Sequence, residues 1–381
     1  MKCLSLVPAL AIATAVSAAI AQAPPPLAPP PPLPEASAPN TGGAGQQRSG
    51  AQPGPSTPAG PATNPSVEIR TPTGAEARGG DATPSRWQPE LDRLDADLRL
   101  RLLTANEPRI EWLAGDIETI DIESQVRHYA AARTSAPGER LYLASLGIAC
   151  LQPVRPSLAP CDAVDRLADW ARRDGDNGVP MLLLAGRARQ RGEADLAASF
   201  VEQAALAPRF DDYWSQGAAR WWAYLRGLDT GIDPAAKAKA AANYASTRDL
   251  AWAPPLRALC AEGQRVERLR NACASVGQAL SARGATFALR LAGARVAEQN
   301  AANDAARTAA RTTHARVLAL TGRCAIATPD FIAALESPRA ADRTAAIEQF
   351  ASWANAQAEQ GEVDACQRLL ASAPASGSRT K

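Results

Sequence analysis

The cysteines are the residues of this 381-residue chain whose type and spacing most directly predict a covalent chemistry. Cys3 lies in the apolar start of the chain, and without it six of the seven cysteines remain, an even number. Three prolines and no helical pattern separate Cys150 from Cys161, which indicates a loop that a disulfide would hold together. Pairing sequence neighbours is the simplest of the patterns that the spacing allows. The predicted disulfides are Cys150–Cys161, Cys260–Cys273 and Cys324–Cys366.

Metal binding is not indicated by these cysteines. No C-x-x-C motif occurs, and the two histidines, His128 and His314, are far apart in sequence, whereas structural zinc sites draw on closely spaced Cys and His ligands. The acidic residues between positions 116 and 123 lack the glycine turn and the ligand spacing of a calcium loop. They are typical of a polar helix face. The sequence therefore predicts no metal and no cofactor.

Motifs for the common catalytic chemistries are also missing. The chain has no nucleophile elbow, no zinc-binding helix motif, no phosphate loop and no dinucleotide fingerprint. Two histidines leave little scope for a nucleophile that is activated by a histidine base. We therefore name no catalytic residue and expect a protein that is not an enzyme.

An aromatic cluster, YWSQGAARWWAYLRG, follows the acidic pair Asp211 and Asp212. Three of its aromatic residues fall on nearly one helical face, which is typical of a surface that packs in the core. Trp222 points about 100° away from the tryptophan before it. An exposed aromatic side chain is suited to contact a peptide or a glycan. The sequence therefore predicts a binding surface at Trp222, Asp211 and Asp212.

The chain begins with a segment that has the features of a secretory signal peptide. Residues 1–21 contain Lys2, an apolar run and the small residues Ala19 and Ala21. Cleavage near Ala21 would remove Cys3 and leave the chain periplasmic or secreted, where disulfides persist. An uncleaved membrane anchor is the alternative, but the run contains Pro8 and polar residues and is only marginally long for a span. We expect no stable membrane span after cleavage.

Residues 22–85 have the composition of a linker. Fourteen prolines lie between Gln22 and Pro65, among small and polar residues. Such a segment cannot bury enough apolar surface to offset the entropy lost on ordering, so we predict a disordered, Pro-rich spacer. A proline-rich ligand for an aromatic-lined groove is the alternative. A flexible tail is expected at residues 374–381.

Residues 86–373 are helical in pattern throughout. The first helix places Leu91, Leu94, Leu98 and Leu102 at spacings of three and four, which is the spacing of one helical face. No run alternates β-branched residues as a strand would. One pattern is unusually long and extends from 286 to 322. The sequence predicts an all-α domain of irregular helical hairpins, arranged as an α-solenoid or as a closed bundle.

Two helical patterns within residues 180–208 flank Gly192 and Glu193. The second of these patterns carries Ala197, Val201, Ala204 and Pro208 at the places of the Ala, Phe, Ala and Pro of a tetratricopeptide unit. The segment therefore resembles such a unit, or the comparable helix pair of a Sel1-type repeat, although Arg189 takes the place of the usual Tyr. This resemblance implies stacked hairpins whose concave face binds partner proteins. The chain also resembles uncharacterised secreted helical proteins of gammaproteobacteria, which implies no activity.

Glu123 is followed by Ser124 in the segment IDIESQVRHYAA. This pair resembles the catalytic Glu and the Ser after it in periplasmic lytic transglycosylases, which also contain helical superhelices. The Gly-Leu-Met-Gln type segment that should follow is absent. The resemblance implies a cell-wall glycan lyase that uses Glu123, and we keep this function as an alternative.

The charge balance excludes one class of partner. Lys and Arg number 41 and Asp and Glu number 39, so there is no general electrostatic reason to expect nucleic-acid binding. Our leading hypothesis is a scaffold or adaptor that binds an unidentified protein partner in the bacterial envelope. A structural spacer protein is a further alternative.

Overall fold

The structure of the chain is a computed structural model. It describes residues 85–102, 107–117, 121–151, 158–162, 165–246, 250–263, 266–324 and 329–372, all within the compact unit Val67–Lys381. These ranges form helices and two isolated β-bridges, without a strand, so the all-α prediction is confirmed. The predicted signal peptide at 1–21, the linker up to residue 84 and the tail at 374–381 lie outside the described residues.

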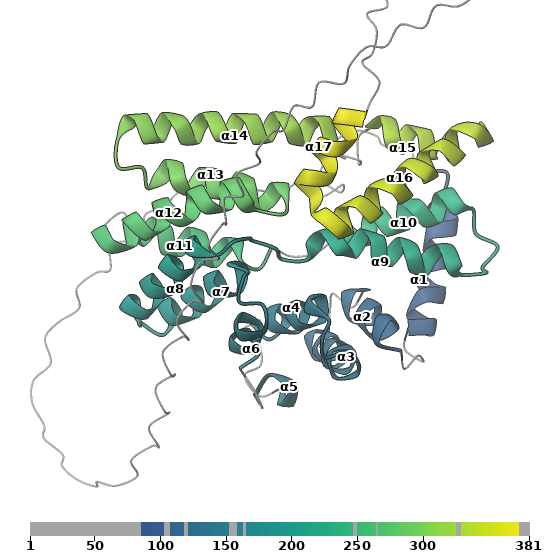
Figure 1. Cartoon of the computed structure of the whole chain (residues 1–381). Helices are drawn as coiled ribbons and strands as arrows, with labels where there is room; N and C mark the ends of the chain where they lie inside the picture. Colours follow the sequence, from purple (N-terminus) through teal and green to yellow (C-terminus); the bar gives the residue numbers. More distant parts are fainter. Residues whose placement is uncertain are drawn as a thin grey trace, which may run out of the picture. The chain divides into compact units, whose positions relative to one another are not determined.

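The described ranges contain seventeen helices (Figure 1). Their bounds are α1 Gln88–Leu102, α2 Pro108–Ile117, α3 Ile122–Ser135, α4 Arg140–Ala149, α5 Ala159–Asp162, α6 Arg166–Arg173, α7 Val179–Gln190, α8 Ala194–Leu206, α9 Trp214–Gly227, α10 Pro234–Ser246, α11 Ala253–Gly263, α12 Glu267–Arg283, α13 Phe287–Gln299, α14 Asp304–Cys324, α15 Pro329–Leu335, α16 Ala340–Gln360 and α17 Glu362–Ser372.

Local sequence explains why these helices form where they do. Leu94, Leu98 and Leu102 are buried on α1, because residues four apart share one face of a helix. The Asp165 carboxylate accepts a hydrogen bond from the Ala168 N–H at 3.1 Å and thereby caps the start of α6. The apolar spacing selects the buried face of each helix, and caps of this kind select where it begins.

The long pattern at 286–322 forms two helices instead of one. The α13 helix ends at Gln299, and the N–H of the next residue, the C-cap Asn300, donates to the Val296 carbonyl at 3.1 Å. The Asn303 side chain then accepts from the Ala306 N–H at 2.9 Å and caps α14. Since α13 packs against α14, the two form a hairpin. The apolar periodicity continues across the turn, and for this reason it did not reveal the break.

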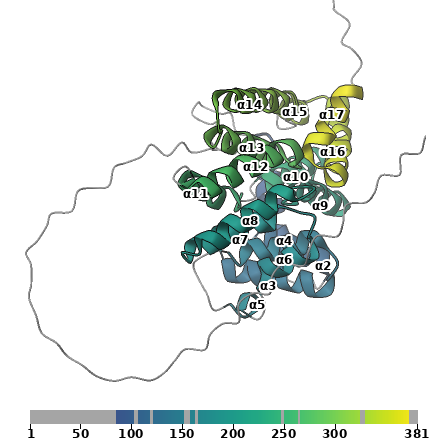
Figure 2. The same cartoon turned by 60° about the vertical axis from the view of Figure 1, so that its left-hand side comes forward.

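The helices pack in tiers from α2 to α14. Each helix of the series α2, α3, α4, α6, α7 and α8 contacts the next one, and α8 then packs against α12, which contacts α13, which contacts α14. Figures 1 and 2 both show this order, with α14 at one extreme and α3 near the other. The α7–α8 pair is a hairpin whose turn contains Gly192, at a positive φ of 78°. Assignment of this hairpin to the tetratricopeptide or Sel1 class stays a prediction.

A second group of helices closes over the flank of this series. The α9 and α10 helices pack together and both contact α16, while α15 contacts α10 and α16. The start of the described chain meets its later part here, because the Trp87 Nε1–H donates to the Leu335 carbonyl at 3.1 Å and the Ser85 hydroxyl donates to Glu336 at 2.7 Å. The C-terminal helices therefore return to α9, α10 and the start of the described chain.

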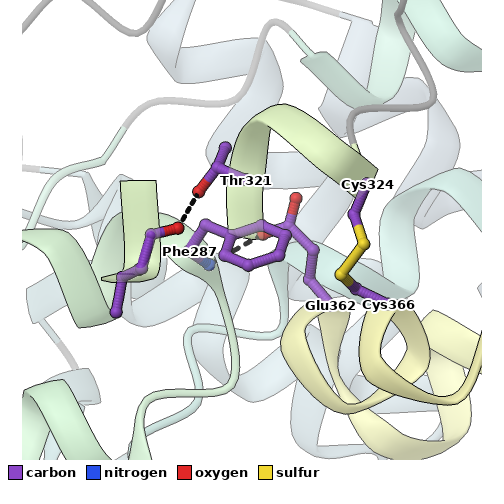
Figure 3. The surroundings of a disulfide bond; sticks show 6 residues. Phe287, Thr321, Cys324, Glu362 and Cys366 are labelled. Carbon is purple, nitrogen blue, oxygen red and sulfur yellow. Dashed lines mark hydrogen bonds between the residues drawn. A yellow bond between two sulfur atoms is a disulfide. The ribbon is translucent and has the colours of Figure 1, made fainter. Parts of the chain in front are cut away.

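All three predicted disulfides are present. Their Cα–Cα distances are 5.5 Å for Cys150–Cys161, 5.6 Å for Cys260–Cys273 and 5.5 Å for Cys324–Cys366, within the range that disulfides require. The third joins the end of α14 to α17, beside a small apolar cluster (Figure 3). It fixes the last helix against α13 and α14.

Candidate functional site

Four interhelical connections are joined to one another by backbone hydrogen bonds. The Gly178 N–H, before α7, donates to the Arg209 carbonyl at 2.9 Å, and the Ala285 N–H, before α13, donates to the Phe210 carbonyl at 2.8 Å. The Val363 N–H of α17 donates to the Ala285 carbonyl at 3.2 Å. These bonds fix the starts of α7, α9, α13 and α17 relative to one another.

The close approach of the last two connections depends on a glycine. Gly361 has a φ of 82°, a conformation that side chains other than glycine rarely adopt. A Cβ atom there would lie 2.9 Å from the Ala285 carbonyl oxygen. Glycine at this position therefore permits both the turn and the contact.

A buried carboxylate, Asp174, fixes the side chains behind these connections. It is fully buried and accepts hydrogen bonds from the Trp170 indole at 3.0 Å, the Asn177 amide at 2.8 Å and the Tyr213 hydroxyl at 2.7 Å. The Arg209 guanidinium pairs with it as well. A buried charge requires such a complete set of partners. Arg209 and Tyr213 are consequently held in place.

Tyr213 has the only positive φ, 60°, among the described residues other than glycine. Backbone strain of this kind persists where surrounding contacts overdetermine it. Here the Tyr213 N–H donates to the Asp211 carboxylate at 2.7 Å, and its hydroxyl is held by Asp174. Burial and the Asp174 hydrogen bond raise the pKa of the Tyr213 phenol, so it stays protonated.

Asp211 and Asp212 lie at the start of α9 and have different surroundings. Asp212 is buried and accepts from the Trp252 indole at 2.9 Å and from the Trp214 N–H at 3.1 Å. The Asp211 side chain is 20% exposed. Burial, with Asp212 adding to it, raises the pKa of Asp211 to about 6. Asp212 therefore has a structural role, whereas Asp211 reaches solvent.

The joined connections border a cleft of about 550 Å³, a volume typical of sites for small ligands or peptide ends. Its walls come from the start of α4, the start of α9, the connection from α12 to α13, and the junction of α16 with α17. The charged residues of the lining are Glu139, Arg140, Arg209, Asp211, Arg283, Arg290, Glu359 and Asp364.

Most of these charges are paired. Glu139 pairs with Arg220 at 3.0 Å, and Arg290 pairs with Asp364 at 3.5 Å. Arg209 is held by Asp174 and Asp176, and Arg140 lies 3.4 Å from Asp174. The fold itself therefore uses the greater part of the charge around the cleft.

Three polar groups of the lining lack such partners. Ser215 is only 2% exposed, and its hydroxyl makes no hydrogen bond to any described residue. The buried Oε1 atom of Gln360 also has no partner in this part of the chain. Arg283 donates to the Ala205 carbonyl at 2.7 Å, but within the described ranges no carboxylate lies at ion-pair distance from it. The cleft thus offers unused donors from Ser215 and Arg283, whereas the Gln360 Oε1 atom is closed off from solvent.

The structure places the three residues of the predicted binding surface in different surroundings. Asp211 lines the cleft, but Asp212 is buried, and the prediction that Trp222 is exposed was wrong. Trp222 is 5% exposed and meets the Phe350 ring edge-on, with centroids 5.7 Å apart. Its place on α9 is covered by α16, a helix from more than a hundred residues later in the chain, which the pattern of α9 could not reveal.

Glu123, the residue of the alternative lyase hypothesis, lies away from the cleft. It is in the first turn of α3, its side chain is 41% exposed, and Arg127 lies 4.0 Å from it one turn later. It does not line the cleft. The structure therefore places this carboxylate outside the cleft at the start of α9.

Ser215, Arg283 and Gln360 were not singled out from the sequence. They come from α9, α12 and α16, and no local pattern links them. Only the acidic pair at 211–212, which precedes Ser215 by a few residues, indicated this part of the chain.

No protein-family model, curated protein or solved structure matches the chain. In the part of the chain that the structure describes, no helix combines the length and apolar character needed to cross a membrane. Nor do the described His, Cys, Asp and Glu side chains form any group of three or more that could hold a metal ion.

Proposed function

We propose that the protein is an exported adaptor of the bacterial envelope that binds another polypeptide through the cleft at the start of α9. The observation that carries this proposal is the cleft itself, in which Ser215 and Arg283 present unused polar groups on a framework fixed by backbone hydrogen bonds. A rigid site with a few unpaired polar groups is suited to recognition.

The lining lacks the partners of an activated serine or cysteine nucleophile. Its described residues include no histidine, cysteine or lysine, and within the described ranges the Ser215 hydroxyl has no base at hydrogen-bond distance. Activation of a serine requires an adjacent base, which favours a binding role for Ser215. Export is supported by the three disulfides, which persist in oxidising compartments.

Site-specific photo-crosslinking in cells tests the proposal. A photoreactive amino acid replaces Gln216, which lines the cleft at the start of α9. The matched control places it at Ala223, which is exposed farther along the same helix. We expect a discrete crosslinked protein from Gln216 and none from Ala223. Absence of any adduct, or the same adducts from both positions, would contradict the proposed function.

Export has a separate test. The mature protein should be recovered from the periplasm or the medium, and its mass should correspond to a chain that starts at Gln22. Recovery of a chain that still begins at Met1 from the cytoplasm would contradict export.

A further inference from the structure

The Ser215 hydroxyl is a buried donor that the fold does not use. It lies in the first turn of α9 on the wall of the cleft, and no hydrogen bond joins it to any described residue. An unpaired buried hydroxyl costs free energy. A ligand in the cleft that accepts a hydrogen bond from this hydroxyl would remove that cost.

Arg283 presents a second unused set of donors. One of its Nη atoms donates to the Ala205 carbonyl at 2.7 Å, and the guanidinium lies 5.8 Å from the centre of the Phe210 ring. These contacts orient the guanidinium and leave its other N–H groups unpaired. The planar fork of an arginine matches the two oxygens of a carboxylate.

The remaining charges of the cleft indicate what kind of anion would fit. Glu139 and Asp364 are paired with arginines. Asp211 reaches solvent at the start of α9 and Glu359 is exposed on the rim, and both carboxylates would repel a doubly charged group more strongly than a singly charged one. The start of α9 adds a partial positive charge beside Ser215. The cleft therefore favours a group with a single negative charge, such as a carboxylate, over a phosphate.

We propose that the cleft binds the C-terminal carboxylate of a partner polypeptide, with Ser215 and Arg283 as its donors. The inference rests on the proposed adaptor function and adds to it the chemical group that is recognised. A chain end requires only one opening, whereas an internal acidic residue requires the chain to enter and to leave.

Three peptides test this inference on the full secreted chain. N-acetyl-trialanine carries a free carboxylate, its C-terminal amide carries none, and a peptide amide with one internal Glu carries a carboxylate away from the chain end. Amide resonances of isotopically labelled protein report binding at Gln216 and Ala285, which line the cleft. We expect the free acid to shift both resonances and the two amides to bind about tenfold more weakly or worse.

Variants connect the binding to the two donors. Ser215→Ala and Arg283→Gln should each weaken binding of the free acid about tenfold. Arg268→Gln is the matched control, because Arg268 lies on the same helix as Arg283 but pairs with Glu202 on α8. This variant should bind the free acid as tightly as the wild type does. Ser215→Ala should not lower the melting temperature of the free protein, which separates a ligand contact from a structural role.

Several results would overturn the inference. They are a free acid that shifts neither resonance, a free acid and an amide that bind equally, and an Arg283→Gln variant that binds like the wild type. Equal binding of the internal-Glu peptide would overturn the assignment to a chain end. A partner crosslinked at Gln216 without peptide binding would refute only this inference, whereas peptide binding without any crosslinked partner would refute only the adaptor function.

Discussion

Replacing Glu362 with Gln should remove a pH dependence from the stability of the fold. Glu362 is the first residue of α17, and its carboxylate accepts a hydrogen bond from the Phe287 N–H of α13 at 2.9 Å (Figure 3). Burial raises the pKa of Glu362 to about 7, from the 4.5 of an ordinary glutamate, and nearby Asp212 adds to the rise while the Phe287 N–H opposes it.

The size of the effect follows from this shift. A group whose pKa is higher in the folded state stabilises the fold below its unfolded pKa, and that contribution is lost as the pH rises through the folded pKa. Each pH unit between the two values corresponds to about 1.4 kcal/mol. The free energy of unfolding should therefore fall by about 2.5 kcal/mol between pH 5 and pH 8 because of Glu362 alone.

Urea denaturation of the wild type and of Glu362→Gln at both pH values measures this loss. Gln resembles the protonated Glu and can still accept from the Phe287 N–H. The variant should therefore gain about 2.5 kcal/mol more, relative to the wild type, at pH 8 than at pH 5. Asp364→Asn is the control, because Asp364 lies two residues later and is 59% exposed. An equal stability difference between Glu362→Gln and wild type at both pH values would refute the reasoning.

Three further predictions concern packing and covalent links. Trp222→Ala should lower the free energy of unfolding in urea by about 3 kcal/mol or more, because Trp222 packs on Phe350 in the core; a change below about 0.5 kcal/mol, as for a surface residue, would contradict its burial. Replacing Cys260 and Cys273 together by Ala should cost about 3 kcal/mol in the same assay, and a double variant as stable as the wild type would contradict that bridge. Gln357→Leu should raise the melting temperature, because both amide atoms of this fully buried side chain lack partners in the described residues; a lower melting temperature would indicate that they are satisfied.

Local features of the sequence were sufficient for the helices and the disulfides. The two patterns within 180–208 predicted the helix pair α7 and α8 around Gly192, because apolar spacing and chain punctuation are properties of neighbouring residues. The disulfide at Cys150 was predicted for a similar reason, since its partner Cys161 is close in sequence and the residues between them are rich in proline. Where two helices shared one continuous pattern, as at 286–322, the sequence did not show the turn.

The sequence by itself therefore determined an all-α body held together by three disulfides. Only the tertiary structure decided which aromatic residue is buried and where the cleft lies. Trp222 is buried because α16 returns to cover α9. Ser215 and Arg283 line one cleft because hydrogen bonds between connections bring the start of α9 and the end of α12 together. The physical reason is that periodicity within a helix specifies which face is apolar, whereas the partner of that face is chosen by packing among segments far apart in the chain.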